Sequence, residues 1–524
     1  MTLIAEIEWG PIDAAVPDEH FREKFIQTPL IAPAISSRYP IVSGTKGSGK
    51  TAIQKWLIGD GGGAYLHKKV ISFNDIQFGV VARNLAQLTS VSDIATLTII
   101  DHYWQYVIVV EAMKTWATNK DYKIVGVDGT KVFAYLRNHG LIEMSAMEML
   151  TTLVTRAWNY VEKLTKPGNG VHYPTLPSNL TTQVIKELTS SPTFDPQFLS
   201  AKTAFFTTLE SSGEKALVIF DEFDDIIAKG GKAREQLQII FDGLVQAAYH
   251  LVTDKAFISN VFLKVLVPHD RFVALELRDL DKVRDFHWPI RWTPETIQEF
   301  LVVRARLHPS TRGKTFRTIW NELLPTKIKN EVYGVSENTY EYILRHTLYR
   351  PRHMQRQLDG LKRVAMVREL TDVGIRQSVR EICKELAADF VTEYQIDHAN
   401  LRGFLNRLKG TTNVMPFHQF KDIVFGALRD YKVEIEVMDK INQLFEIGFF
   451  GVMRYVTEHS EVDPSLSICY APTRHQGNRY HFNFYYIEPV DNVSSSLTAD
   501  TLIAVHPIFF DLCDQQPHKE ILVA

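Results

Sequence analysis

Short, mostly apolar runs alternate with longer amphipathic segments through the first half of the chain. Runs of about five apolar residues bounded by turn residues are typical of buried strands. We predict five such strands, at Tyr39–Ser43, Lys69–Phe73, Ala216–Phe220, Phe262–Val267 and His287–Trp292. Helix-compatible sequence lies between them. Strands that alternate with helices favour an α/β fold with a parallel sheet covered on both faces.

A long, mostly helical region separates the second predicted strand from the third. Apolar residues recur at i+3 and i+4 spacing over Ile94–Trp116 and Ala146–Leu164, which predicts two long helices. The most apolar stretch, Thr96–Met113, includes three ionisable residues and is therefore predicted to be a buried helix rather than a membrane span. Two interruptions are expected: Asp121–Gly140, with a turn at Asp128-Gly129, and a proline-rich loop over Pro167–Pro196.

The second half of the chain changes character twice. Thr293, Pro294 and Glu295 have the types preferred at an N-cap and in a first helical turn, and helical periodicity then continues to about Val391. From residue 400 onward, short helices and alternating strands are predicted at Phe417–Arg429, Val437–Glu446, Phe449–Val456 and Tyr480–Ile487.

Composition narrows the class of protein. The 524 residues are 45% apolar and 23% charged, which is ordinary for globular proteins. A net charge of −3 and a pI near 6.7 exclude an overall polycation, so any nucleic-acid contact requires a local basic patch. Cys383, Cys469 and Cys513 are widely spaced and fit a reducing compartment. Glu6 and Glu8 stand where a signal peptide would carry cations, so we expect a soluble cytoplasmic protein.

The glycine-rich segment GTKGSGKT, from Gly44 to Thr51, matches the pattern G-x-x-x-x-G-K-[ST]. Glycines allow a tight turn whose N–H groups point at phosphate oxygens, and the following helix adds its positive N-terminal end. A strand before and a helix after favour nucleotide binding over a simple surface turn. The predicted nucleotide-binding residues are Gly44, Thr45, Lys46, Gly47, Ser48, Gly49, Lys50, Thr51 and Ala52.

Within this loop, Lys50 is expected to reach the β- and γ-phosphates, and the Thr51 hydroxyl to bind Mg²⁺. The third predicted strand ends in Asp221 and Glu222, which are followed by two further acids. Carboxylates at a strand end suit metal binding and water activation, so Asp221 is the predicted Mg²⁺ ligand and Glu222 the general base. A solvated acidic turn is the alternative.

Polar residues also follow the fourth predicted strand, in the segment Pro268-His269-Asp270-Arg271. A side chain at this strand end can contact the γ-phosphate or the attacking water, so His269 and Asp270 are sensor candidates. An ordinary strand-to-loop transition is the alternative. Arg271, Arg278 and Arg284 are the candidates for reaching a neighbouring subunit.

A basic helix is predicted further along the chain. Residues 345–368 include seven Arg or Lys and a single acid, Asp359. Arg350 or Arg352 is predicted to contact the nucleotide, whereas a solvated basic face or a nucleic-acid patch is the alternative. Lys362 lies about 100° around the helix from Arg363, so the charge does not form one stripe. We therefore favour nucleotide contact and ion pairs over DNA binding.

The chain resembles AAA+-like P-loop ATPases in an ordered set of five segments. These are GTKGSGKT, VIFDE, the strand ending in PHD, LRDLDK…IRW and YRPRHMQ. The junction into the Arg-Pro-Arg helix is similar to the branch that holds origin-recognition-type initiators and STAND signalling ATPases. More narrowly, it resembles bacterial P-loop ATPases of antiphage and conflict loci. The resemblance spans about residues 30–520. One departure is Pro268-His269, where relatives often carry an Arg-containing turn.

The resemblance implies an α/β fold with a five-stranded parallel P-loop core, a helical insertion at about 85–210, a helical lid and a winged-helix-like C-terminal domain. The expected segments are 1–38 (extension), 39–292 (core), 293–395 (lid) and 396–524 (C-terminal domain). The implied function is a regulatory ATPase that uses ATP and Mg²⁺, assembles as a homo-oligomer and controls an effector protein in antiviral defence. The alternatives are an initiator- or repair-type DNA-binding ATPase and a slowly hydrolysing, nucleotide-locked scaffold.

Overall fold

The computed structural model describes most of the chain: residues 3–72, 78–89, 93–121, 125–165, 187–188, 195–221, 234–275, 277, 280–330, 335–394, 400–427, 434–455, 474–475, 478–485, 490 and 492–515. Contacts divide the chain into two units. The sheet unit is Ile31–Ile290, and the lid unit combines Met1–Leu30 with Arg291–Ala524. The N-terminal segment therefore belongs by its contacts to the same unit as the C-terminal half.

The sheet unit is built on five parallel strands. They are β1 (Ile41–Gly44), β2 (His67–Ser72), β3 (Ala216–Asp221), β4 (Val261–Pro268) and β5 (His287–Pro289). Their order across the sheet is β2-β3-β4-β1-β5, and every pairing is parallel. The predicted α/β class, the five strands and the parallel sheet are confirmed.

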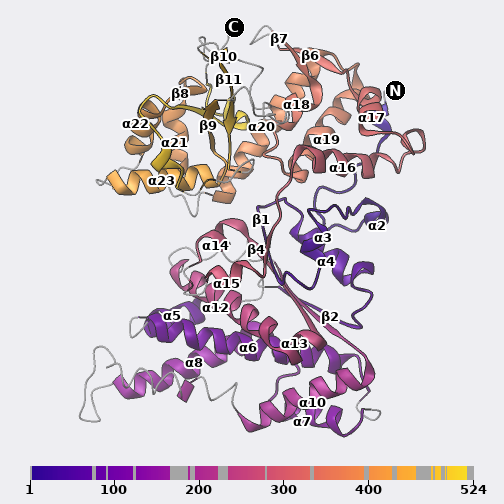
Figure 1. Cartoon of the computed structure of the whole chain (residues 1–524), viewed down its shortest axis with the longest axis vertical. Coiled ribbons are helices and arrows are strands. Elements are labelled where there is room, and N and C mark those ends of the chain that lie inside the picture. The colour runs from indigo at the N-terminus through magenta and orange to yellow at the C-terminus, as the bar shows by residue number, and fades with distance from the viewer. Residues whose placement is uncertain are drawn as a thin grey trace. The chain divides into compact units, whose positions relative to one another are not determined.

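Helices cover this sheet on both faces. Helix α4 (Lys50–Ile58) contacts β1, β2 and β3, and α3 (Ala32–Ile35) contacts α4 and β5. Figure 1 shows α3 and α4 on one side of β1 and β4, with α12 (Arg234–Thr253) on the other side. Strands β3 and β4 are buried along their full length, and their sequences are apolar rather than alternating, apart from Lys264 within β4 and Asp221 at the end of β3.

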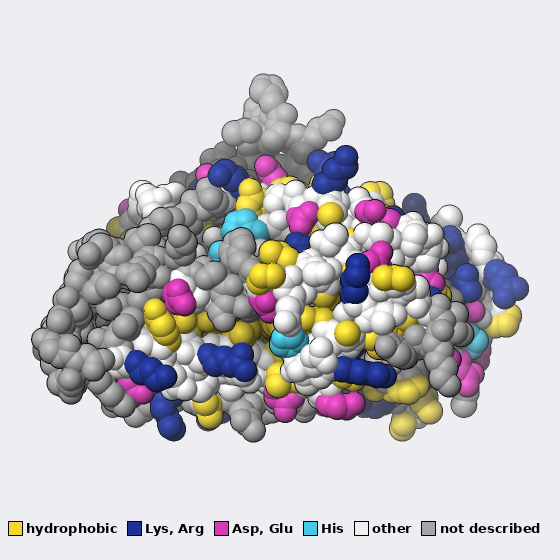
Figure 2. All heavy atoms as spheres, turned by 90° about the horizontal axis from the view of Figure 1, so that it is seen from below, with side chains coloured by type: hydrophobic (Ala, Val, Ile, Leu, Met, Phe, Trp, Pro, Cys, Tyr) yellow, Lys and Arg dark blue, Asp and Glu magenta, His cyan; other side chains and the backbone are white. Residues whose placement is uncertain are grey.

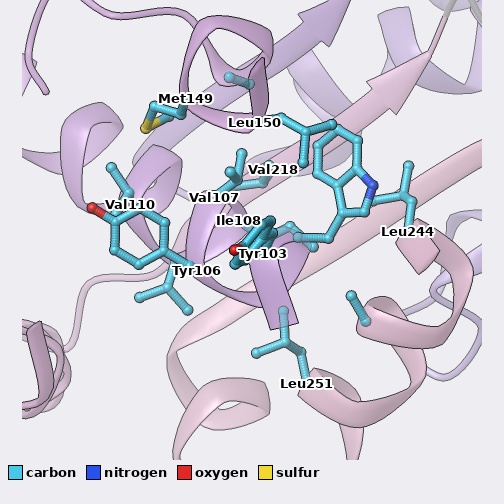
Figure 3. Packing of buried hydrophobic residues seen from close by; sticks show 14 of the residues in the cluster. Tyr103, Tyr106, Val107, Ile108, Val110, Met149, Leu150, Val218, Leu244 and Leu251 are labelled. Carbon is cyan, nitrogen blue, oxygen red and sulfur yellow. The ribbon is translucent and has the colours of Figure 1, made fainter. Parts of the chain in front are cut away.

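The helical region between β2 and β3 is part of the core of the sheet unit. Helix α6 (Asp93–Thr118) packs on β2, β3 and α12, so it covers one face of the sheet. Trp104 lies at the centre of this contact: its indole N–H donates to the Ile240 carbonyl over 2.9 Å, and its ring meets Phe220 edge-on at 5.7 Å. Figure 3 shows the side chains of α6 interleaved with those of α12 and β3.

The buried-helix prediction for Thr96–Met113 is confirmed, and two of its three ionisable residues, Asp101 and Glu111, lie close to basic side chains. Asp101, which is 3% exposed, lies 3.0 Å from the His250 ring of α12, and Glu111 lies 2.7 Å from Lys114. The remaining helices of this region are α5 (Phe78–Thr89), α7 (Val127–Asn138), α8 (Ala146–Thr165) and α10 (Pro196–Ser212).

The interruption predicted over Asp121–Gly140 is wrong, because α7 occupies most of it. Asp128 lies in the first turn, where the helix dipole favours a carboxylate. A Cβ at Gly129 would lie 3.0 Å from the Trp116 ring, so this glycine permits close helix packing instead of forming a turn. Pro196 starts α10, with Asp195 as N-cap. Residues 167–186 and 189–194 of the predicted proline-rich loop lie outside the described residues.

The lid unit begins with α16 (Pro294–Ala305), whose predicted start is confirmed. The Thr293 hydroxyl accepts from the Thr296 N–H over 3.3 Å, and the Thr296 hydroxyl accepts from the Thr293 N–H over 2.8 Å. Four further helices follow: α17 (Phe316–Leu323), α18 (Thr339–Leu344), α19 (Pro351–Val367) and α20 (Asp372–Tyr394). A hairpin of β6 (Lys327–Asn330) and β7 (Val335–Asn338), which the helical periodicity did not predict, lies between α17 and α18.

The N-terminal segment is docked on these helices. Helix α1 (Leu3–Glu6) contacts α17 and α19, and α2 (Phe21–Lys24) contacts α16. The Lys362 amine donates to the Ile7 carbonyl over 2.9 Å, and the Arg304 guanidinium donates to the Lys24 carbonyl over 3.1 Å. Two cations of the lid thus donate to carbonyl oxygens of the first 30 residues.

The C-terminal part of the lid unit combines a mixed set of helices with an antiparallel sheet. The helices are α21 (Leu401–Leu408), α22 (Phe417–Ala427) and α23 (Glu434–Glu446). The strands are β8 (Val414–Pro416), β9 (Phe450–Tyr455), β10 (Arg474–His475), β11 (Asn478–Asn483) and β12 (Leu502–Val505), ordered β10-β11-β9-β12-β8. In the parts of the chain that the structure describes, no helix has the length and apolar character needed to cross a bilayer.

Among the described residues of the lid unit, three histidines are buried. The His346 ring faces the Tyr342 carbonyl at 2.6 Å, His353 lies on α19, and the His506 ring accepts from the Ile508 N–H over 3.2 Å. Burial lowers the pKa of all three, and nearby cations including Arg345 and Arg350 lower it further. For His346 the pKa falls to about 3. These rings are therefore neutral in the folded protein at neutral pH.

We predict that acid destabilises the lid unit through these histidines. The unfolded chain binds protons near pH 6.5, whereas folded His346 binds one only near pH 3, so stability is complete above pH 6.5 and falls as the pH decreases below it. Each such histidine contributes a slope of up to about 1.4 kcal/mol per pH unit. His346→Asn should reduce that slope in urea unfolding. His20→Asn, at an exposed histidine, should leave it unchanged.

Candidate functional site

The glycine-rich loop connects β1 to α4 at the carboxyl edge of the parallel sheet. Gly47 and Gly49 have backbone φ angles of 80° and 105°, which residues other than glycine rarely adopt. Gly49 is the N-cap of α4, so the helix begins at Lys50 as the sequence predicts. Thr51 and Ala52 occupy the first turn of α4, and Lys46 is exposed on the loop.

The loop is closed by its own contacts. The Lys50 ammonium donates to the Gly44 carbonyl over 2.7 Å and to the Thr45 carbonyl over 3.4 Å, and its side chain is buried. The Ser48 N–H donates to the Thr45 carbonyl over 3.1 Å. A Cβ at Gly44 would lie 2.3 Å from the Ser48 hydroxyl, so the first glycine allows the loop to approach itself. One buried cation therefore lies among backbone dipoles at the start of a helix.

The acidic strand end lies at the same edge of the sheet. Asp221 is the last residue of β3 and is only 2% exposed. In the parallel register Phe220 lies opposite Val265, and Pro268 lies opposite Gly44. One strand, β4, separates β3 from β1, and the register places Asp221 level with Val42. Asp221 and Gly44 are therefore two strand spacings apart across the sheet, about 10 Å, and two residues apart along the strands. Glu222 lies outside the described residues, as do the two acids after it.

The end of β4 brings His269 to the base of the loop. His269 begins the short helix α14 (His269–Val273), and its Nδ1 lies 3.1 Å from the hydroxyl of Ser43, the residue before Gly44. Asp270 lies 3.9 Å from the Arg271 guanidinium. Arg271 is 5% exposed, which does not suit contact with another subunit in this conformation.

Of the other two arginines considered for intersubunit contact, Arg284 is exposed and lies 3.4 Å from Asp281. Arg278 lies outside the described residues. Thus only Arg284, among the described candidates, presents its guanidinium at the surface.

A second histidine, absent from the sequence-based predictions, shares the Ser43 hydroxyl. His287 Nε2 on β5 lies 2.8 Å from this oxygen, and the His287 ring stacks on Phe272 of α14 with centroids 3.5 Å apart. Ser43 is fully buried, so its hydroxyl is enclosed between two imidazoles. In the sequence, His287 is an isolated histidine in an aromatic strand, and no spacing relates it to Ser43 244 residues away.

The two lid arginines predicted to contact nucleotide are engaged within the lid unit. Arg350 is buried, and donates to Glu393 over 3.1 Å and to the Tyr394 hydroxyl over 3.2 Å. Burial lowers the pKa of Arg350, but Glu393 and Tyr394 raise it by more, so the net pKa lies above its usual range. Arg352 lies 3.9 Å from Asp13 and remains about a third exposed.

Most of the basic segment 345–368 is paired with acids of the same unit. Five of its seven cations form ion pairs: Arg345 with Glu337, Arg350 with Glu393, Arg352 with Asp13, Arg356 with Asp389, and Lys362 with Glu8. The partners come from β7, from α20 and from the N-terminal segment. This pairing leaves no continuous basic stripe along α19.

The described residues were also compared with the ligand clusters typical of protein metal sites. Among the described residues, no cluster of three or more His, Cys, Asp or Glu side chains is arranged to hold a metal ion. Cys383 and Cys513 are both buried and reduced, and burial raises the pKa of the Cys513 thiol to about 12. The described thiols are thus poor metal ligands and poor nucleophiles.

Comparison of the chain with protein-family models, with curated proteins and with solved structures yields no match. The site is therefore interpreted from its own residues.

We predict that Gly49→Ala destabilises the sheet unit by about 1–3 kcal/mol. No atom lies within 4 Å of the position of the added Cβ, so the cost comes from the backbone angle of +105° rather than from a clash. The matched control is Gly403→Ala in α21, where the Cβ also meets open space but φ is not positive. It should stabilise by up to about 1 kcal/mol. Equal effects in thermal unfolding would contradict the backbone explanation.

Proposed function

We propose that this protein is a Mg²⁺-dependent, ATP-binding and ATP-hydrolysing regulatory ATPase with an AAA+-like P-loop core and a winged-helix-like C-terminal domain. The observation that carries the proposal is the placement of the Gly44–Thr51 loop. It joins the four-residue strand β1 to α4 at the sheet edge where β3 delivers Asp221. The motif alone predicts a phosphate loop, and the parallel sheet adds an acid at the matching edge.

The loop offers what a triphosphate requires. The positive φ of Gly47 and Gly49 suits a turn whose N–H groups converge on an anion. The N-terminus of α4 adds a partial positive charge, and Lys50 adds a full one. Lys50 now donates to carbonyls of the loop, and phosphate oxygens are stronger acceptors for the same ammonium group. ATP is the substrate, and ADP the product, that this chemistry favours.

The donor set also fits Mg²⁺. A buried carboxylate at Asp221 and a hydroxyl at Thr51 are hard oxygen ligands, and Mg²⁺ is held in such sites by one or two carboxylates with substrate phosphates. When bound, the ion neutralises charge on the transferred phosphoryl group. Glu222 would orient and deprotonate the attacking water. Arg350 and Arg352 remain candidates for nucleotide contact only if their pairs with Glu393 and Asp13 open.

The paired cations of the lid support the regulatory proposal over the DNA-binding one. A surface that tracks a phosphate backbone needs several available Lys or Arg side chains. Five cations of segment 345–368 instead form ion pairs within the unit. On the face drawn in Figure 2, Lys and Arg side chains are interspersed with Asp and Glu. We propose that nucleotide turnover controls homo-oligomer assembly or an effector protein in antiviral defence.

The first test concerns affinity. Lys50→Ala should abolish tight ATP binding measured by calorimetry, because the phosphates lose their main cation and only the loop amides remain. Lys409→Ala, at an exposed lysine of the other unit, should bind ATP like the unmodified protein. Normal affinity in Lys50→Ala would remove the phosphate-loop assignment.

The second test concerns chemistry. Glu222→Gln should retain ATP but slow hydrolysis by roughly 10²–10⁴, the range for removal of a general base. Asp221→Ala should instead weaken the dependence of turnover on Mg²⁺. If Glu222→Gln turns over normally, another residue is the base and Asp224 is the next to substitute. If the unmodified protein binds ATP tightly without turnover, the nucleotide-locked scaffold replaces the hydrolase.

A further inference from the structure

We propose that His287 is a positioning residue for ATP hydrolysis, which acts through the Ser43 hydroxyl to set the orientation and tautomer of His269. The inference rests on the proposed function, because it assigns His269 a contact with the transferred phosphate. It adds a residue from β5 that belongs to none of the nucleotide-binding motifs.

One oxygen joins the end of β1, the first residue of α14 and the first residue of β5. The Ser43 hydroxyl lies 3.1 Å from His269 Nδ1 and 2.8 Å from His287 Nε2, so both rings are within hydrogen-bond distance. Ser43 is the residue before Gly44 and is fully buried. A change in either ring is therefore transmitted to the residue that starts the loop.

Proton counting limits this arrangement to two orders, and the proposed phosphate contact selects one of them. A serine hydroxyl has a single proton, so between two neutral imidazoles it donates to one and accepts from the other. If His287 donates from Nε2–H, Ser43 must donate to His269 Nδ1, and the proton of His269 then resides on Nε2. That tautomer presents an N–H donor, as contact with a phosphate oxygen requires. In the reverse order Nε2 of His269 would carry a lone pair instead of a proton, and a lone pair repels a phosphate oxygen.

A second contact holds the same pair together. The His287 ring stacks on Phe272 at 3.5 Å with an interplanar angle of 14°, and Phe272 lies one turn after His269 in α14. His287 thus contacts α14 by ring stacking and, through Ser43, by hydrogen bonding. The two contacts can be separated by substitution, which makes the proposal testable.

The strand that carries His287 also leads out of the sheet unit. The Ile290 N–H donates to the Ser43 carbonyl over 2.7 Å, and Ile290 is the last residue of the unit. Ser43 is therefore bonded to β5 through its side chain and its backbone. This double attachment explains why we assign the positioning role to a residue of β5.

The test uses two complementary variants of the full chain. His287→Phe keeps a ring against Phe272 but removes both nitrogens, whereas His287→Gln keeps a donor near the Nε2 position but removes the ring. We expect His287→Phe to lower kcat by about 10- to 100-fold with ATP affinity unchanged, since misplacement of a contacting group has this order of effect. His287→Gln should recover most of that loss. His20→Phe, at an exposed histidine, is the control.

Ser43→Ala supplies a double-mutant cycle. Because both substitutions break one relay, Ser43→Ala combined with His287→Phe should lose no more than either alone. Normal kcat in His287→Phe, or an equal loss in His287→Gln, would overturn the proposal, since ring packing alone would then account for the histidine. Additive losses in the cycle would also overturn it.

A spectroscopic readout separates this inference from the proposed function. Ring-nitrogen chemical shifts of ¹⁵N-histidine-labelled protein report the tautomer of His269 without any ATP turnover. We expect Nε2–H in the unmodified protein and loss of that preference in His287→Phe. If the tautomer responds but turnover does not depend on Lys50, the proposed function fails while the relay stands. An unchanged tautomer overturns the relay.

Discussion

The parallel pairing of β1 with both β4 and β5 is the constraint on which the rest of the sheet unit depends. Parallel strands place their carboxyl ends at one edge, so Gly44, Pro268 and Pro289 come to the same side of the sheet. The glycine-rich loop, the start of α14 and the chain leaving β5 are therefore neighbours although they are far apart in sequence. Ser43 connects all three through one hydroxyl and one carbonyl.

The length of chain between β2 and β3 would suggest a peripheral insertion, yet its helix α6 covers a face of the sheet. A parallel sheet needs apolar cover on both sides, and α6 with α12 provides it on one of them through Trp104 and its neighbours. Aromatic contacts of this kind bury large areas and have a defined geometry. The position of β3, and hence of Asp221, depends on this helix.

In the lid unit, ion pairs and hydrogen bonds to backbone carbonyls hold the helices and the N-terminal segment together. The N-terminal 30 residues lie against α16, α17 and α19, where their carbonyl oxygens accept hydrogen bonds from Lys362 and Arg304. Buried Arg350 is held by Glu393 and Tyr394 of α20. Removing one partner from a buried ion pair costs much free energy, because the other charge then stays buried without a partner. Opening of these pairs therefore requires a compensating anion for each arginine.

The sequence by itself determined the local features of this protein. The five strands, the helix start at Thr293 and the glycine-rich loop follow from apolar runs, capping residues and motif spacing, which act over a few residues. The turn predicted at Gly129 was wrong, because that glycine allows close packing against Trp116, a residue of another helix. Likewise, only tertiary structure brought His287 to Ser43, decided which acids pair with the lid cations and covered the sheet with α6. Those outcomes depend on strand order and on contacts between distant segments, and a one-dimensional pattern contains no distance between such segments.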